Sequence, residues 1–188
     1  YRVLAEFALT TPSGQPYLRV VSKPSDEVCL RAKADRPLLT KVSVDITDAT
    51  DGVITVKWIG PQPEAIDTVQ NPGPYQFQLM RASGINGTNF QPVAGAFFSS
   101  ALFSGLKDSL FVDSNLDTRS TGYNYRVDFS TGPSTFSASS QLASSVYLTT
   151  EPSDEASILS WQYEVPWDNY SFEIWRSDQG GPFNLIAT

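Results

Sequence analysis

The chain has 188 residues, of which 40% are hydrophobic and 18% are charged, and it contains no histidine. This hydrophobic content is sufficient for packed cores in one or two domains. The formal net charge is −7, and no cluster of lysine and arginine interrupts the acidic balance. A nucleic-acid backbone or an anionic membrane surface would be repelled, so neither is an expected partner. No apolar run approaches the length of a membrane span.

The first segment, residues 1–36, is predicted to supply the C-terminal strands of a β-module. Residues 1–7 and 27–32 alternate or run apolar, and residues 11–14 form a turn cluster between them. Cys29 is the only cysteine, so it can form no disulfide within these 188 residues and no zinc site built from several thiolates. We expect it to be a small buried hydrophobic side chain.

Residues 37–150 are predicted to form one complete module of seven strands. Apolar and polar residues alternate along most of these strands, and Asp51-Gly52 and Asn86-Gly87 are turn signals between them. Residues 94–106, rich in Ala, Phe and Ser, favour a loop with a short strand over a helix. The predicted strands cover residues 42–46, 53–58, 75–81, 89–94, 110–112, 123–129 and 141–148. Short strands separated by turns, without a helical period, indicate an all-β fold, namely a β-sandwich.

The last segment, residues 151–188, repeats the start of the central module and is predicted to supply the N-terminal strands of a following one. Self-similarity at a period of about a hundred residues indicates tandem domains, because solenoid units are shorter. A further echo lies at the start of the chain, where Tyr1-Arg2-Val3 resembles Tyr125-Arg126-Val127. The other matching pairs are residues 54–58 with 158–161, residues 75–81 with 170–176, and residues 90–94 with 183–187.

The two partial modules are expected to have apolar faces and unpaired strand edges. Isolated two-stranded pieces do not tolerate such exposure. If both segments are ordered, we expect them to be covered by the parent protein, by a partner chain or by each other.

One set of residues in the central module resembles the fibronectin type III pattern. The set comprises an aromatic residue in each of the second and third strands, a leucine before the sixth strand and a Tyr-x-Tyr-x-Val run within it: Trp58, Tyr75, Leu116, Tyr123, Tyr125 and Val127. The resemblance implies tandem fibronectin type III-like, that is immunoglobulin-like, β-sandwich modules. It also implies a tyrosine corner, in which Leu116 and Tyr123 lie together and the tyrosine hydroxyl bonds to the backbone of the turn.

A narrower resemblance covers the whole chain. The Pro-rich connection at residues 67–75, and its counterpart at residues 165–170, are similar to segments of gliding-motility-associated surface proteins exported by the type IX secretion system. The resemblance implies a secreted protein at the extracellular or outer-membrane cell surface, with a structural or adhesive role. Its expected partners are other modules of the parent chain and other surface proteins, secretion-system proteins or glycans, without direct membrane insertion.

No catalytic residue is predicted. Without histidine, neither a Ser-His-Asp nor a Cys-His nucleophilic pair can form within these residues. The carboxylates are scattered over turns, and no two lie in an apolar setting that would separate their pKa values. We therefore expect a non-enzymatic segment without a cofactor.

A weak metal candidate lies at the end of the first strand of the central module. Asp45, Asp48 and Asp51 form an acidic run that leads into a glycine. Oxygen-rich loops of this kind can hold Ca²⁺, although the spacing is not that of a calcium loop. The alternative interpretation is a solvated strand end with an Asp-Gly turn.

A candidate binding loop contains Trp167, Asn169 and Tyr170. A loop indole can stack on a sugar ring or a partner protein, or it can cap the open end of a sandwich. We expect the replacement of Trp167 with alanine to leave the melting temperature of the central module unchanged and to weaken any surface or glycan binding. Two functions remain open: a spacer and interaction surface of a cell-surface protein, and an accessory or carbohydrate-binding module of a secreted glycan-degrading enzyme.

Overall fold

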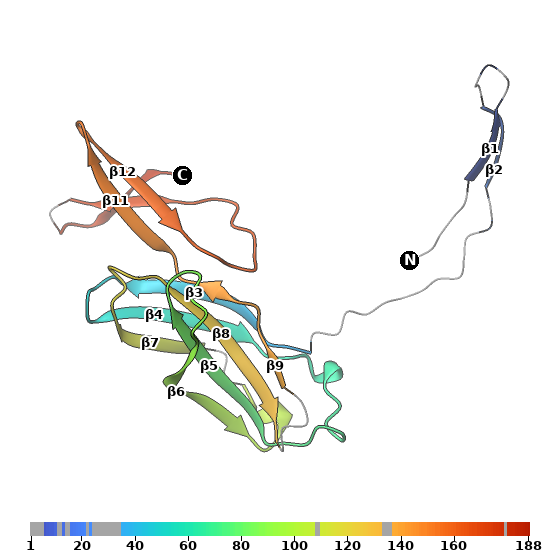
Figure 1. The fold of residues 1–188 in the computed structure, drawn as a ribbon, viewed down its shortest axis with the longest axis horizontal. Helices are drawn as coiled ribbons and strands as arrows, with labels where there is room; N and C mark the ends of the chain where they lie inside the picture. The colour runs from blue at the N-terminus through green and yellow to red at the C-terminus, as the bar shows by residue number, and fades with distance from the viewer. Residues whose placement is uncertain are drawn as a thin grey trace. The chain divides into compact units, whose positions relative to one another are not determined.

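A computed structural model of the chain describes residues 6–10, 13, 16–21, 23, 35–107, 110–132, 137–178 and 180–188. The chain divides into two compact units, Tyr1–Lys33 and Ala34–Thr188, which are described separately. Antiparallel β-strands make up most of the regular structure in both (Figure 1). Cys29 and the strand predicted at residues 27–32 lie outside the described residues.

The described ranges include no helix that is long and apolar enough to cross a membrane.

The N-terminal unit contains one antiparallel pair, β1 (Glu6–Thr10) and β2 (Pro16–Val21). The backbone register places Phe7 opposite Val20 and Leu9 opposite Leu18. Within the described part of the chain, this pair forms a two-stranded sheet with no further strand.

The second unit begins with two antiparallel sheets. The first sheet has the order β3-β4-β7, and the second has the order β10-β8-β5-β6, with β9 also pairing with β8. The strands are β3 (Leu38–Ile46), β4 (Gly52–Ile59), β5 (Tyr75–Ser83), β6 (Gln91–Ser100), β7 (Leu110–Leu116), β8 (Tyr123–Thr131), β9 (Ser137–Ser139) and β10 (Ala143–Ser144), with 3₁₀ turns at η1 (Pro63–Ala65) and η2 (Phe103–Gly105). Two antiparallel sheets around a shared core give a β-sandwich-like architecture.

The core lies between these two sheets. Trp58, Tyr75, Phe77 and Val127 all belong to it. The indole of Trp58, from β4, meets the ring of Phe77, from β5, edge-on at 6.0 Å between ring centroids. Such edge-to-face pairs are favoured by the ring quadrupoles and add to the burial energy. The contact therefore joins the second strand of one sheet to the third strand of the other.

A buried polar cluster also links the sheets. Asp113, on β7, is 4% exposed and accepts hydrogen bonds from Arg81 Nη1 on β5, at 2.7 and 2.8 Å to its two oxygens. The Tyr125 hydroxyl on β8 donates to Asp113 Oδ2 at 2.9 Å. The Arg81 guanidinium lies over the Tyr123 ring, 5.5 Å from its centroid. A buried carboxylate needs such partners, because an unpaired buried charge is costly.

This cluster differs from the expected tyrosine corner. The buried hydroxyl is that of Tyr125, and its partner is the Asp113 carboxylate rather than the backbone of the turn. Leu116 is buried in the core at the end of β7, as the pattern predicts. The assignment of the corner to Tyr123 was wrong because Tyr123 is only partly buried and its ring covers Arg81.

Three strands differ from prediction for identifiable reasons. In β3, Val42 is buried but Ile46 is 52% exposed, because the register shifts between Val44 and Ile46 and reverses the alternation. Strand β6 continues to Ser100 instead of ending near residue 94; Gly95, at φ +76°, lets it continue beyond an irregularity. The strand predicted over residues 141–148 is divided, since β10 ends at Ser144.

The C-terminal part of this unit consists of two antiparallel pairs. Strands β11 (Tyr147–Ser153) and β12 (Ala156–Gln162) form one pair, and β13 (Ile174–Ser177) and β14 (Phe183–Ala187) form the other. The sequence predicts a module boundary between residues 150 and 151. Strand β11 continues across this position, because it pairs with β12 along its whole length. Strand β13 starts at Ile174, later than the predicted start at Tyr170.

We predict that Leu79→Ala will destabilise the central sandwich by about 2–5 kcal/mol, because it leaves a cavity at a fully buried position on β5. The matched control is Leu110→Ala at the start of β7, where the leucine is 46% exposed, and it should cost about 1 kcal/mol or less. Urea denaturation followed by circular dichroism measures both. Equal losses of stability would contradict the assigned core.

The buried hydroxyl of Tyr125 predicts how the free energy of unfolding depends on pH. Burial, followed by the negative charge of Asp113, raises the pKa of Tyr125 above its ordinary value of 10.0. The folded state therefore keeps this tyrosine neutral while the unfolded state ionises, so stability is retained below pH 10 and falls as the pH rises above it. The expected fall is about 1.4 kcal/mol per pH unit.

The measurement is the free energy of unfolding in urea at pH 9, 10 and 11. The informative quantity is the difference in slope between variants, because it isolates the contribution of Tyr125. Tyr125→Phe should have a shallower fall than the unmodified chain, whereas Tyr170→Phe, at a side chain that is 93% exposed, should not. Identical slopes for all three proteins would rule out the assigned role of Tyr125.

Candidate functional site

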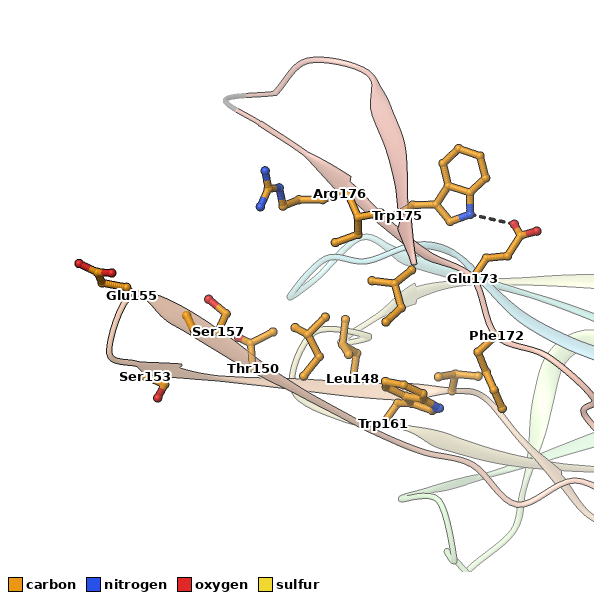
Figure 2. Close-up of a pocket in the computed structure, with 15 residues that line it drawn as sticks. Leu148, Thr150, Ser153, Glu155, Ser157, Trp161, Phe172, Glu173, Trp175 and Arg176 are labelled. Carbon is orange, nitrogen blue, oxygen red and sulfur yellow. Dashed lines mark hydrogen bonds between the residues drawn. The ribbon is translucent and has the colours of Figure 1, made fainter. Parts of the chain in front are cut away.

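An apolar groove lies between the two C-terminal hairpins. It has a volume of about 1060 Å³ and is lined from β11–β12 on one side and from residues 172–176 and β14 on the other. Figure 2 shows side chains of both hairpins projecting into this space. Apolar residues that contribute to the lining are Leu148, Leu159, Trp161, Phe172, Ile174 and Ile186.

One end of the groove is built from aromatic rings. The Trp161 ring on β12 and the Phe172 ring lie 5.5 Å apart between centroids, and the Tyr163 ring lies at the same distance from the Phe172 ring. Trp161 and Phe172 are the repeat counterparts of Trp58 and Phe77. The contact that joins the two sheets of the central sandwich therefore recurs between β12 and the segment that leads into β13.

Charged side chains line the outer parts of the groove. Glu155 lies in the turn between β11 and β12, and Glu173 accepts a hydrogen bond from Trp175 Nε1 at 3.0 Å (Figure 2). Arg176, the repeat counterpart of Arg81, is also in the lining and pairs with Asp178 at 3.1 Å. Both partners of this ion pair are more than half exposed, so it contributes little to stability.

In the described part of the chain, two strands beside the groove, β12 and β13, each lack a neighbour that the corresponding strand of the central sandwich has. There, β4 lies between β3 and β7, and β5 lies between β6 and β8. Their counterparts β12 and β13 each have one partner among the described strands, β11 and β14 respectively. The groove therefore combines an apolar floor with two edges whose backbone groups are available for pairing.

The connection between the two hairpins packs onto the central sandwich. Ser144, on β10, donates its backbone N–H to the carbonyl oxygen of Glu164 at 2.7 Å, and Ser144 Oγ accepts the backbone N–H of Glu164 at 2.7 Å. Ser144 is 1% exposed. The side chains of Val165 and Trp167 pack against the core of the central sandwich. These contacts fix the start of the connection to the sandwich.

The predicted binding loop is therefore divided between two environments. Trp167 is partly buried against the core, as expected of a residue that caps the sandwich. Asn169 and Tyr170 are exposed, and Tyr170 reaches 93% exposure. The expectation that Trp167→Ala would leave the melting temperature unchanged is inconsistent with this packing. The three residues do not form one exposed surface.

The acidic run at the end of β3 makes local hydrogen bonds. Asp48 Oδ1 accepts the backbone N–H groups of Thr50 and Asp51 at 2.8 and 3.1 Å, and these bonds lower the pKa of Asp48. The Asp45 carboxylate accepts a hydrogen bond from the Thr55 hydroxyl. Across the described ranges, no three His, Cys, Asp or Glu side chains are grouped so that they could hold a metal ion. Asp45, Asp48 and Asp51 thus serve the turn and the neighbouring strand.

The Pro-rich connection before β5 is held by similar local bonds. Asp67 Oδ1 accepts the backbone N–H groups of Val69 and Gln70 at 2.9 and 3.1 Å, and the Tyr75 hydroxyl donates to the Asn71 carbonyl oxygen at 3.0 Å. The segment at residues 67–75 is thereby fixed as a turn that leads into β5.

The groove and the junction were not identified from the sequence. A signal for the groove was available, because the repeat places Trp161, Phe172 and Ile174 at positions whose counterparts are buried core residues. The junction had no such signal, since Ser144 and Glu164 belong to segments that look like ordinary polar connections.

We predict that Trp167→Ala will lower the stability of the central sandwich by about 1–3 kcal/mol, because it removes a partly buried indole from the edge of the core. Tyr170→Ala, three residues later and almost fully exposed, is the control and should change stability by less than about 0.5 kcal/mol. Thermal unfolding followed by circular dichroism tests both. An unchanged melting temperature for Trp167→Ala would contradict the capping role.

Comparison of the chain with protein-family models, with curated proteins and with solved structures found no match.

Proposed function

We propose that this chain is a non-catalytic structural and adhesive segment of a large secreted bacterial cell-surface protein that takes part in gliding motility. It acts as a spacer built from tandem fibronectin type III-like modules and offers a surface to proteins or glycans. The residues that resemble gliding-motility-associated proteins motivate the cellular setting, and the junction between successive modules supports the mechanical part.

The strand order supports the type of module. The first, second and fifth strands, β3, β4 and β7, form one sheet. The third, fourth and sixth strands form the other sheet together with the two short last ones, β9 and β10. This division resembles that of an immunoglobulin-like sandwich in which the strand after the third joins the sheet of the third and sixth strands, as strand C′ does. The recurrence of the Trp58–Phe77 contact as Trp161–Phe172 supports a second module of the same kind.

The observation that carries the spacer role is the fixed junction. A spacer transmits position only if neighbouring modules do not swing freely, and domains joined by a linker alone do swing. Here the reciprocal Ser144–Glu164 bonds and the packing of Val165 and Trp167 tie the connection of the following module to the central sandwich. Residues 34–188 accordingly form one compact unit.

We predict that the central sandwich and the C-terminal hairpins tumble together in solution. ¹⁵N relaxation of the full chain should give one rotational correlation time for both parts. The double variant Ser144→Ala/Trp167→Ala should give a shorter correlation time for residues 174–187 than for the sandwich, because it removes a side-chain acceptor and the capping indole. Tyr170→Ala should behave like the unmodified chain. Independent tumbling of the unmodified hairpins would refute the spacer mechanism.

The alternative function is an accessory or carbohydrate-binding module of a secreted glycan-degrading enzyme. The exposed ring of Tyr170, beside the exposed amide of Asn169, is the feature that favours it, because exposed aromatic rings can stack on sugars. A glycan array separates the two functions. Binding of a defined glycan that is lost in Tyr170→Ala, with the junction intact, would favour the alternative.

A further inference from the structure

We propose that residues 143–145, at the end of the central sandwich, form a latch that couples the closure of the sandwich to the docking of the connection that follows it. In this latch, Ser145 holds the sandwich strand β8, and Ser144 holds Glu164 of the connection. The proposal rests on the spacer role for its setting. It adds a property that a rigid junction does not require, namely that each of the two contacts strengthens the other.

The last part of the sandwich is attached to β8 by very little strand pairing. Strand β8 pairs with β9 over three residues and with β10 over two, and residues 140–142 between them belong to neither strand. Strands in globular proteins usually have roughly three to ten residues, so the two-residue β10 is a weak attachment. Other contacts must therefore hold this part of the chain against β8.

Two buried serines provide such contacts where the strand is interrupted. Ser145 donates its backbone N–H to the carbonyl oxygen of Tyr123 at 2.8 Å, and Ser145 Oγ accepts the backbone N–H of Tyr123 at 3.0 Å. Ser140 makes the same reciprocal pair with Val127, and both of these bonds are 2.9 Å long. In each pair the serine hydroxyl takes the place of a strand carbonyl, so a buried N–H of β8 keeps an acceptor.

Ser144 makes a third reciprocal pair, which faces the other way. Its backbone N–H and its Oγ bond to the carbonyl oxygen and the N–H of Glu164, both at 2.7 Å. Successive residues of an antiparallel strand direct their backbone N–H groups to opposite sides, so Ser145 engages β8 while Ser144 engages the connection. Both serines are 1% exposed, and a single peptide unit joins them. The two contacts therefore share one short piece of buried backbone.

This shared backbone makes the two contacts cooperative. Fixing the dihedral angles of residues 143–145 costs conformational entropy, whichever contact forms first. Docking of Glu164 already orders Ser144, so Ser145 then binds β8 with a smaller loss of entropy, and the reverse holds equally. Release of either contact leaves buried polar groups without partners, which is unfavourable. The latch is thus a two-state element that both contacts bias, and linkage makes their effects on each other reciprocal.

Native-state hydrogen exchange of the full chain, followed by NMR at single amides, tests the coupling. Ser144→Ala should speed exchange at the Tyr123 N–H, although the acceptor of that group, Ser145 Oγ, is unchanged in this variant. Ser145→Ala should likewise speed exchange at the Glu164 N–H, whose acceptor, Ser144 Oγ, is intact. Each of these cross effects should be about fivefold or more. Both are measured relative to the amides of β5, which is paired on both sides and reports on global unfolding.

The matched control is Ser139→Ala on β9. Ser139 is exposed, and its hydroxyl bonds to the Asp128 carboxylate instead of a backbone amide, so this change should leave both amides unaffected. A measurement on the unmodified chain guards against variants that fail to fold. With increasing urea, the Tyr123 and Glu164 amides should open with the same free energy and the same urea dependence, because they open together.

Three results would each overturn the latch. They are exchange effects confined to the altered bond, equal effects of Ser139→Ala and Ser144→Ala, and different urea dependences for the Tyr123 and Glu164 amides. Any of these results would leave the spacer role intact as long as the sandwich and the C-terminal hairpins share one rotational correlation time. Separate tumbling would instead refute the spacer role, so the two failures are distinguishable.

Discussion

The packing of a tryptophan from the second strand against a phenylalanine from the third is the contact on which the described structure depends. In the central sandwich, Trp58 and Phe77 belong to different sheets, so their edge-on contact fixes how the sheets face each other. The equivalent rings, Trp161 on β12 and Phe172 just before β13, lie 5.5 Å apart and line the groove. A repeated sequence motif therefore gives a repeated tertiary contact, although the surrounding strands differ.

The Asp113 cluster explains what a completed sandwich adds. Burial of the Arg81 guanidinium opposes its positive charge and lowers its pKa. The hydrogen bonds and negative charge of Asp113 outweigh burial, so the pKa of Arg81 is raised. Its counterpart Arg176 pairs with Asp178 at the surface. The cluster needs strands β7 and β8, because they carry Asp113 and Tyr125. The buried polar cluster therefore requires strands equivalent to β7 and β8, whereas the Trp–Phe contact forms without them.

The all-β architecture and the central core were predictable because alternation with period two reports burial directly, as at Phe77, Leu79 and Val127. Prediction failed where a local irregularity changed that period, as at Ile46, or allowed a strand to continue past a glycine, as at Gly95. Asp113 was overlooked because an aspartate within a Val-Asp-Ser-Asn run resembles a surface residue, and its partners are distant in sequence. The groove could not be predicted from the alternation of apolar and polar residues, because it is formed by side chains of segments that are distant along the sequence.

The junction has a consequence for the part of the chain that follows it. Because Val165 and Trp167 pack on the core of the sandwich, and Glu164 and Ser144 exchange hydrogen bonds, the connection between the hairpins is anchored at its start. An unanchored flexible linker would instead leave the orientation of the following segment averaged. Packing at this one junction is thus the physical step on which the proposed spacer role depends.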